Sequence, residues 1–308
     1  MHKPFILFTI LILAFGSCKK DKPVPASTAT APRLVFKFKF DSTQTRLDNF
    51  GNISTLPATH RAQCPKFNAM SAHYIEMAND NQLLGQGKIL FNAPTTTLGG
   101  AGAIDFNQSV VVAEGQEFFA VPLSQVTAGT YKWLRVSLAY QNYDILYKSA
   151  ALPGNGIGTG TIASFIGYNT YVTSYKIKTQ TISPSAATGG PGNHKQGYWG
   201  FETTVAGTAY TSDGQSPAGA TTVVNPMPNS PIPAGSCVVT GQFIGPAGTL
   251  QSLTITGTET SDIVITVSLS TNNSFEWVEH SGDNYFQPAA GDTVVDMGIR
   301  GLIPFSNH

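Results

Sequence analysis

The sequence predicts an all-β protein, an antiparallel β-sandwich with long loops rich in Gly and Pro. Apolar and polar residues alternate over several stretches, which is the period-2 pattern of strands with one buried face. Turn residues separate these stretches, and none of them shows the period of an amphipathic helix. About ten short strands divided by turns are typical of two packed antiparallel sheets.

The clearest strand lies within residues 128–143. Every second position is apolar, at Leu134, Val136, Leu138 and Tyr140, while the other phase holds Trp133, Arg135, Ser137 and Ala139. Just before them, Gly129 permits the positive φ of a tight turn. We therefore expect a tight corner followed by a long core strand, with Tyr140 on the same buried face as Leu134.

The same pattern predicts strands on both sides of this stretch. Residues 34–40 place Leu34 and three phenylalanines on one face and mostly charged residues on the other. Other strands are expected at 67–78, 88–92, 110–112, 117–123, 168–178, 237–243 and 263–269, with a strand pair within 197–210. Loops are expected at 42–66 and at 154–160 within the Gly-rich stretch 150–164, with loop inserts at 184–193 and 212–235. Together these elements predict one sandwich domain over residues 34–308, of the immunoglobulin or transthyretin type.

The start of the chain predicts export and lipidation. Residues 1–17 form a signal peptide, with a basic start at Lys3, a short apolar run and small residues before Cys18. The Gly-Ser-Cys ending resembles a bacterial lipobox, whose cysteine receives the lipid and becomes the first mature residue. Residues 18–33 then hold the lipidated Cys18 and a flexible linker rich in Lys, Pro, Ser and Thr. We therefore expect a palmitate-bearing lipoprotein that contacts the membrane through its lipid anchor.

The residues around Cys18 and the composition of the chain also bear on where the protein is located and on its binding partners. Cys18 is followed by Lys19 rather than Asp, which is compatible with the outer membrane of a bacterial cell envelope and leaves both the periplasmic face and the cell surface open. Charged residues make up 12% of the chain and the formal net charge is zero. Such a chain has no basic stripe for phosphates, so nucleic acid is excluded as a partner.

Two cysteines remain in the predicted domain. An oxidising compartment allows Cys64 and Cys237 to pair. Cys237 falls in a strand pattern, however, and Cys64 in a loop beside Pro65, which favours two unpaired thiols with one of them buried.

The polar run of residues 279–296 is the candidate metal site. It brings hard oxygen ligands near a glycine-bearing turn, as calcium loops do, at Asp283, Asn284, Asp292 and Asp296. The strict EF-hand spacing is absent, and Asp and Asn are also ordinary turn residues. The run therefore has two interpretations, a structural calcium site and a plain turn.

The sequence shows no catalytic machinery, and we expect no enzyme activity. It contains neither a GxSxG elbow nor an HExxH motif, and no nucleophile, base and orienting group are recognisable together. Residues 154–160, GNGIGTG, superficially resemble a phosphate-binding loop. Such a loop needs a following helix and a lysine, so we interpret these glycines as a flexible loop.

Tyr198 and Trp199 are the candidate ligand-binding aromatics. Glycines flank the pair beside the 184–193 loop, so we expect both side chains at the surface. Sandwich lectins stack sugar rings on exposed aromatics, which makes a glycan a candidate ligand. Most aromatics of such a domain belong to the core, which is the alternative for this pair.

Five segments together resemble a known family. They are LVFKFKF at 34–40, FNAMSAHYIEM at 67–77, AIDF at 103–106, VTAGTYKWLRVSLAY at 126–140 and GYWGFET at 197–203. They resemble the MbnP-like family of exported, copper-associated β-sandwich proteins found beside haem-peroxidase partners. The resemblance implies a copper site built on a modified tryptophan with a histidine two positions on. At that spacing the three tryptophans are followed by Arg135, Phe201 and Glu279, so no copper ligand is assigned.

These observations favour a non-catalytic binding or interaction module, anchored by its lipid in the cell envelope, with an envelope protein as partner. Two alternatives stay open. One is a copper-handling protein of the MbnP-like kind, with His194, Trp199, Trp277 and His280 as contributors. The other is a glycan-binding accessory lipoprotein of an outer-membrane uptake system.

Overall fold

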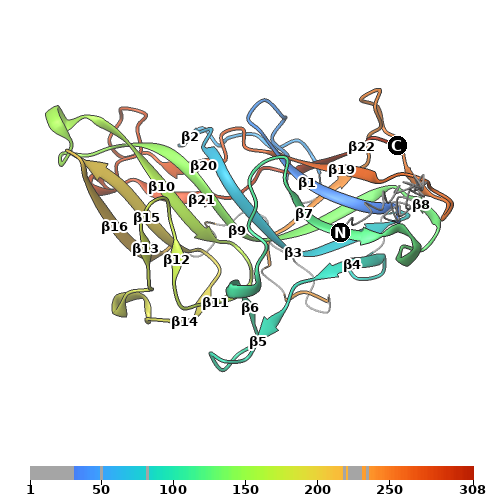
Figure 1. The fold of residues 1–308 in the computed structure, drawn as a ribbon. Helices are drawn as coiled ribbons and strands as arrows, with labels where there is room; N and C mark the ends of the chain where they lie inside the picture. Colours follow the sequence, from blue (N-terminus) through green and yellow to red (C-terminus); the bar gives the residue numbers. More distant parts are fainter. Residues whose placement is uncertain (1–30, 49–50, 81–82, 218–219, 221–230, 234–235) are drawn as a thin grey trace, which may run out of the picture. The chain divides into compact units, whose positions relative to one another are not determined.

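The computed structural model describes residues 31–48, 51–80, 83–217, 220, 231–233 and 236–308. These residues form strands and short 3₁₀-helices without any α-helix, so the predicted all-β, sandwich-like fold is confirmed (Figure 1). No helix in this part of the chain has the length and apolar character needed to cross a membrane. The predicted signal peptide, Cys18 and most of the linker lie outside the described residues.

A four-stranded sheet forms one layer of the sandwich, in the order β22, β19, β1, β7. Its strands are β1 (Arg33–Asp41), β7 (Glu117–Pro122), β19 (Ile263–Ser270) and β22 (Leu302–Ser306). The β1 strand is antiparallel to β7 but parallel to β19, with Leu34 opposite Ile263. Residue alternation predicts a strand's buried face but not its direction, so this parallel pair was not predictable from it.

A seven-stranded sheet forms the other layer, in the order β16, β15, β10, β9, β3, β4, with β17 paired to the first half of β9. Its strands are β3 (Lys66–Ala78), β4 (Lys88–Asn92), β9 (Trp133–Lys148), β10 (Ile157–Phe165), β15 (Tyr198–Val205), β16 (Thr208–Gln215) and β17 (Val238–Gln242). With sixteen residues, β9 is the longest strand and touches three others.

Four smaller sheets complete the described chain. One has the order β14 (Gly192–Lys195), β11 (Asn169–Val172), β6 (Ala103–Asp105), β5 (Thr95–Thr96). Another has the order β2 (His60–Gln63), β20 (Phe275–Val278), β21 (Thr293–Met297). Two pairs are β12 (Tyr175–Lys176) with β13 (Thr181–Ile182), and β8 (Gly129–Tyr131) with β18 (Leu253–Ile255). The 3₁₀-helices are η1 (Phe106–Gln108), η2 (Leu123–Gln125), η3 (Pro153–Asn155), η4 (Ala186–Thr188) and η5 (Pro288–Ala290).

The main core fills the space between the two large sheets. It joins the alternate apolar residues of β1 and β19 to those of β3, β9 and β17, among them Phe36, Phe38, Leu134, Val136 and Val267. All five are at most 1% exposed. Full burial of one such side chain contributes about 1.5–3 kcal/mol, so this layer is the main source of stability.

A β-bulge in β9 redirects the second half of the strand. Leu138 pairs with Ala72 and Tyr140 with Ser71, which leaves Ala139 as the extra residue. Leu138 therefore faces the main core, whereas Tyr140 packs with Phe165 in a different cluster. The prediction that Tyr140 shares the buried face of Leu134 is wrong, because period-2 counting does not detect a bulge.

Beyond the bulge, the odd-numbered residues of β9 face inward. Tyr143, Ile145 and Tyr147 join a second core with Phe275 and Trp277 of β20. The rings of Phe67 and Tyr143 connect the two cores, with centroids 4.9 Å apart. The bulge thus gives one strand two buried segments of opposite phase.

The glycines of residues 154–160 do not form a flexible loop throughout, as the sequence predicts, because β10 begins at Ile157. Its glycines make room for aromatic rings of neighbouring strands. A Cβ at Gly160 would lie 2.1 Å from the ring of Phe201, and one at Gly158 would lie 3.2 Å from Tyr147. Small residues here serve packing between strands rather than phosphate binding.

Other strands and loops also differ in their bounds from the sequence prediction. Residues 42–66 include β2, and residues 110–112 form only a single bridge, between Met70 and Val112. The insert expected at 184–193 holds η4 and the start of β14. The insert expected at 212–235 begins as the end of β16, and most of the remainder lies outside the described residues. Both Cys64, which is exposed, and Cys237, which is buried, are free thiols.

Candidate functional site

A cavity of about 490 Å³ lies at the second core. Its walls come from β9, β10, β15 and β16 of the seven-stranded sheet and from β20, β21 and the residues between them. The wall is mainly aromatic and aliphatic, with Tyr147, Trp199, Phe201, Phe275 and Phe286 as its rings. We call it the aromatic cavity.

Local sequence explains why these rings converge. In β15 the alternate residues Trp199 and Phe201 point to the same face of the sheet, and Gly160 and Gly214 lie beneath them. A Cβ at Gly214 would lie 2.4 Å from the Trp199 ring. The hydroxyl groups of Tyr147 and Thr203 are 3.0 Å apart, which fixes the polar end of that ring.

The polar side chains that line the aromatic cavity are either exposed to solvent or already bonded to other groups of the protein. Ser212 and Thr293 are exposed, whereas Lys148 donates to Asp283 at 2.5 Å. The carboxylate of Asp292 accepts from two backbone N–H groups. An apolar wall with a few polar groups at its margin suits a small, mainly apolar ligand.

A second, smaller cavity of about 280 Å³ lies on the other side of β20 and β21. Its walls are Arg46, Ser54, Thr55, Pro57, His60, Glu276, Val295 and Arg300. Phe275 and Trp277 face the second core, while Glu276 between them faces this cavity. We call it the arginine cavity.

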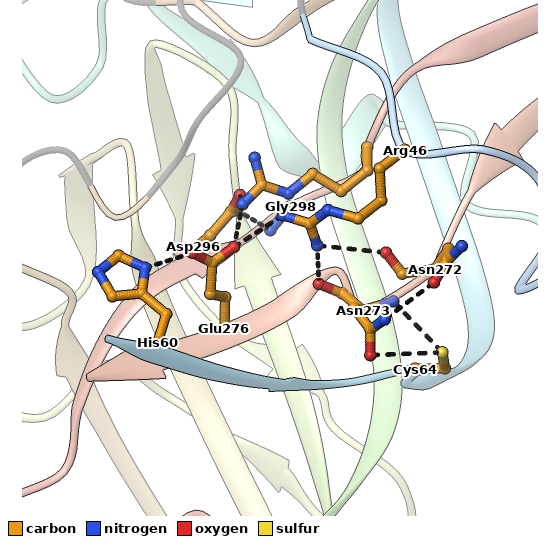
Figure 2. Close-up of polar contacts among 9 residues, drawn as sticks. Arg46, His60, Cys64, Asn272, Asn273, Glu276, Asp296 and Gly298 are labelled. Carbon is orange, nitrogen blue, oxygen red and sulfur yellow. Dashed lines mark hydrogen bonds and ion pairs between the residues drawn. The ribbon is translucent and has the colours of Figure 1, made fainter. Parts of the chain in front are cut away.

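Glu276 is the centre of the arginine cavity (Figure 2). Its Oε1 lies 2.5 Å from His60 Nδ1, and its Oε2 accepts from Arg46 Nη2 at 2.9 Å and from Arg300 Nη2. Arg300 also pairs with Asp296. Burial alone would raise the pKa of Glu276, but the hydrogen bonds from His60 and Arg46 and the charge of Arg300 hold that pKa below its usual range.

Arg46 connects this network to the turn after β19. Its Nη1 donates to the backbone carbonyls of Asn272 and Asn273. In Figure 2 the same turn also meets Cys64, whose sulfur accepts from the Asn273 N–H at 3.2 Å. The arginine cavity is therefore built by two regions of the chain, residues 46–60 and 272–300, that are far apart in the sequence.

The predicted calcium ligands are divided among different partners. Asp283 is paired with Lys148, and Asn284 accepts from Arg61 Nε at 2.6 Å. Asn284 also has a positive φ of 65°, as turn residues do.

Of the other two, Asp292 binds the backbone N–H groups of His280 and Gln287. Asp296 belongs to the arginine cavity, where it pairs with Arg300 and accepts from the Gly298 N–H at 2.8 Å. Among the described residues, no group of three or more His, Cys, Asp and Glu side chains is arranged to hold a metal ion. The geometry of this run is that of a turn whose carboxylates bind its own backbone.

Tyr198 and Trp199, predicted together at the surface, lie on opposite faces of β15. Tyr198 is fully buried and donates to Asp213 at 2.9 Å, so its predicted exposure is wrong. Trp199 is half-buried and lines the aromatic cavity. Adjacent residues of a strand point to opposite faces, so only one of the pair can serve a given site.

The histidines and tryptophans proposed for copper handling are also separated. His194 stacks on Tyr198 with ring centroids 4.0 Å apart, on the face of β15 opposite Trp199. The indole N–H of Trp277 donates to Glu279 at 3.0 Å, and His280 is exposed.

A buried Ser–His pair was not detected in the sequence. Ser137 Oγ lies 2.6 Å from His73 Nε2, but the hydroxyl donates to the carbonyl of Cys237 and so accepts from the imidazole. Both side chains are at most 2% exposed. The serine hydroxyl has no hydrogen directed at the imidazole, so this geometry is not that of a nucleophile and its base.

No protein-family model matches the chain, and comparisons with curated proteins and with solved structures find no similar protein. The resemblance to the MbnP-like family therefore stays a prediction from the sequence.

Proposed function

We propose that this protein is a lipid-anchored binding module of the bacterial cell envelope, and that the aromatic cavity holds its ligand. The ligand is a small, mainly apolar molecule that carries a ring. The observation that carries the proposal is the convergence of five aromatic side chains on one cavity of about 490 Å³.

The size and chemistry of the cavity support a binding role. Ligand sites typically measure about 300–1,000 Å³ and combine apolar walls with a few polar groups. Aromatic faces favour stacked or edge-on rings, each such contact adding about 0.5–1.5 kcal/mol beyond burial. Trp199 and Phe201 are the half-buried rings of the wall, so a ligand can reach both.

A glycan is the second candidate ligand. Sugar rings stack on tryptophan faces, and the exposed hydroxyl group of Ser212 belongs to the same cavity wall as Trp199. This candidate differs from the first in its polarity, so one titration distinguishes them.

The test is a fluorescence titration of the purified protein with the uncharged dye N-phenyl-1-naphthylamine. We expect saturable binding that weakens at least tenfold, about 1.4 kcal/mol, in Trp199→Ala and in Phe201→Ala. Tyr210→Ala is the matched control, because Tyr210 is an exposed aromatic of β16 outside the cavity wall.

Equal dye affinity in the wild type and in folded Trp199→Ala would contradict the proposal. Competition by neutral oligosaccharides at concentrations where aliphatic alcohols do not compete would favour the glycan over the apolar ligand.

A further inference from the structure

We infer that the ligand of the aromatic cavity carries a quaternary ammonium group, a positive charge without N–H donors. The inference rests on the proposed function, because it names the chemical class of the ligand that this cavity binds. It is carried by the arrangement of the aromatic rings and by a carboxylate in the wall that no cationic side chain of the described residues neutralises.

The rings of the wall are arranged as corners rather than as a flat slot. The planes of Tyr147 and Phe201 meet at 88°, with centroids 5.4 Å apart, and those of Phe275 and Phe286 meet at 80°, with centroids 5.0 Å apart. Perpendicular rings suit a rounded group such as trimethylammonium. A cation within about 6 Å of a ring centre is attracted by the negative ring face, and the attraction grows where water is excluded.

The charges of the wall favour a cation over an anion. Lys148 and Asp292 are the charged residues of the wall in the part of the chain that the structure describes. The Lys148 ammonium is paired with Asp283 at 2.5 Å, so its charge is offset. Asp292 forms no ion pair with any described residue, because its carboxylate accepts only from backbone N–H groups.

The negative charge of Asp292 is therefore available to a ligand. Backbone N–H groups satisfy its hydrogen bonds but supply no positive charge. Residues 218–235, which follow the wall residue Pro217, contain no charged side chain. The residue is only 6% exposed, and a buried charge acts over several ångströms in a low dielectric, so the attraction does not require contact with the carboxylate oxygens.

The hydrogen-bonding groups of the wall favour a cation without N–H donors. Both carboxylate oxygens of Asp292 already accept, and the Tyr147 hydroxyl is bonded to Thr203. The Ser216 hydroxyl donates to the sulfur of Met297 at 2.7 Å. A primary ammonium would bring three donors that each need an acceptor, whereas a quaternary ammonium brings none and leaves no buried donor unsatisfied.

The test is displacement of N-phenyl-1-naphthylamine from the full-length purified protein by phenyltrimethylammonium and, separately, by tert-butylbenzene, which has the same shape but no charge. We expect the cation to displace the dye at about a tenfold lower concentration, although it is the less hydrophobic of the two. Displacement by tert-butylbenzene at an equal or lower concentration would overturn the inference and leave the proposed function intact, because the dye still binds. Absence of dye binding to the wild type would contradict both.

Two charge variants test the source of the selectivity. Asp292→Asn keeps the size of the side chain and should raise the concentration of phenyltrimethylammonium that displaces half of the dye about tenfold, with that of tert-butylbenzene unchanged. Asp262→Asn is the matched control, because Asp262 pairs with Arg33 outside the cavity wall.

Asp292→Asn also removes acceptors that hold the local backbone, so a second variant guards against misfolding. Lys148→Gln removes a positive charge from a partly exposed ion pair and should lower the half-displacing concentration of the cation about threefold. Lys178→Gln is its control, since Lys178 pairs with Asp144 outside the wall. An unchanged ratio between cation and isostere in Lys148→Gln and in folded Asp292→Asn would overturn the inference.

Discussion

Single residues decide the stability of the polar interior. Glu276 is 3% exposed and holds together Arg46, Arg300 and His60. Exposed ion pairs contribute little by comparison, because water and salt screen them. The arginine cavity is therefore the place where one lost charge has a large effect.

Glu276→Gln should destabilise the protein by about 3–5 kcal/mol, because the two buried guanidinium groups lose their shared carboxylate. Urea unfolding followed by tryptophan fluorescence measures the change. Glu117→Gln, which breaks the exposed pair with Arg33, is the control and should cost about 1 kcal/mol or less. Similar losses in both variants would show that burial of the network does not matter.

His73 predicts a dependence of stability on pH. Burial lowers the pKa of His73 from 6.5 to about 3, so the unfolded state binds the proton more readily than the folded state. Stability contributed by neutral His73 is fully present above pH 6.5 and is lost as the pH falls towards 3, by about 1.4 kcal/mol per unit.

His73→Gln should flatten this dependence between pH 7 and 5, measured by urea unfolding at each pH. Glutamine has an N–H that can donate to Ser137 but does not titrate. His280→Gln is the control, since His280 is exposed. An unchanged slope in His73→Gln would assign the acid sensitivity to other groups.

At the scale of elements, contacts between sheets depend on small residues at chosen positions. Gly241 in β17 pairs with Leu134 of β9 and lies against the backbone of β22. A Cβ at Gly241 would lie 2.3 Å from the Leu302 carbonyl oxygen. This glycine lets a strand paired with the seven-stranded sheet approach a strand of the four-stranded sheet.

Gly241→Ala should therefore destabilise the protein by about 1–3 kcal/mol, as overpacked cores do, because the obstacle is backbone and not a movable side chain. The measurement is the urea midpoint at constant m-value. Gly102→Ala is the control, because a Cβ there meets nothing within 4 Å. Equal midpoints for both alanine variants would mean that the sheets can separate without loss.

The sequence predicted the elements better than it predicted the sites. Alternation located β1, β4, β9, β15, β17 and β19, because a half-buried strand must alternate. Alternation did not predict the bulge at Ala139, because an extra residue changes the phase of the pattern. It did not predict the glycine-containing strand β10 either, because glycine has no side chain that marks a buried or exposed face.

The sites depend on residues that only the fold brings together. Arg46 and His60 lie 230 and 216 residues before Glu276, so no local spacing connects them to it. A signal was present in Glu276, a charged residue between the apolar Phe275 and Trp277. A charged residue at this position indicates either a buried charge or an exposed strand face, but it does not predict which residues contact Glu276.

At the scale of the whole molecule, the proposed anchor makes a prediction of its own. Cys18→Ser should move the protein from the membrane fraction to the soluble fraction and abolish labelling by a palmitate analogue, because a serine cannot form the thioether of a lipoprotein. Cell fractionation with immunoblotting measures the first effect. Cys64→Ser, which changes an exposed free thiol, should leave both signals intact. Retained label in Cys18→Ser would place the lipid elsewhere, and absence of label on the wild type would rule it out.

The parallel pair of β1 with β19 determines when the protein can fold. Arg33 N donates to the carboxylate of Asp262, 229 residues later. The first strand, β1, therefore has both of its neighbours, β7 and β19, only after most of the chain has been synthesised. Pairing over such a distance carries a large loop-closure entropy and slows folding. A sheet that is completed this late fits the export that the predicted signal peptide implies, because a chain must be unfolded to be threaded across a membrane.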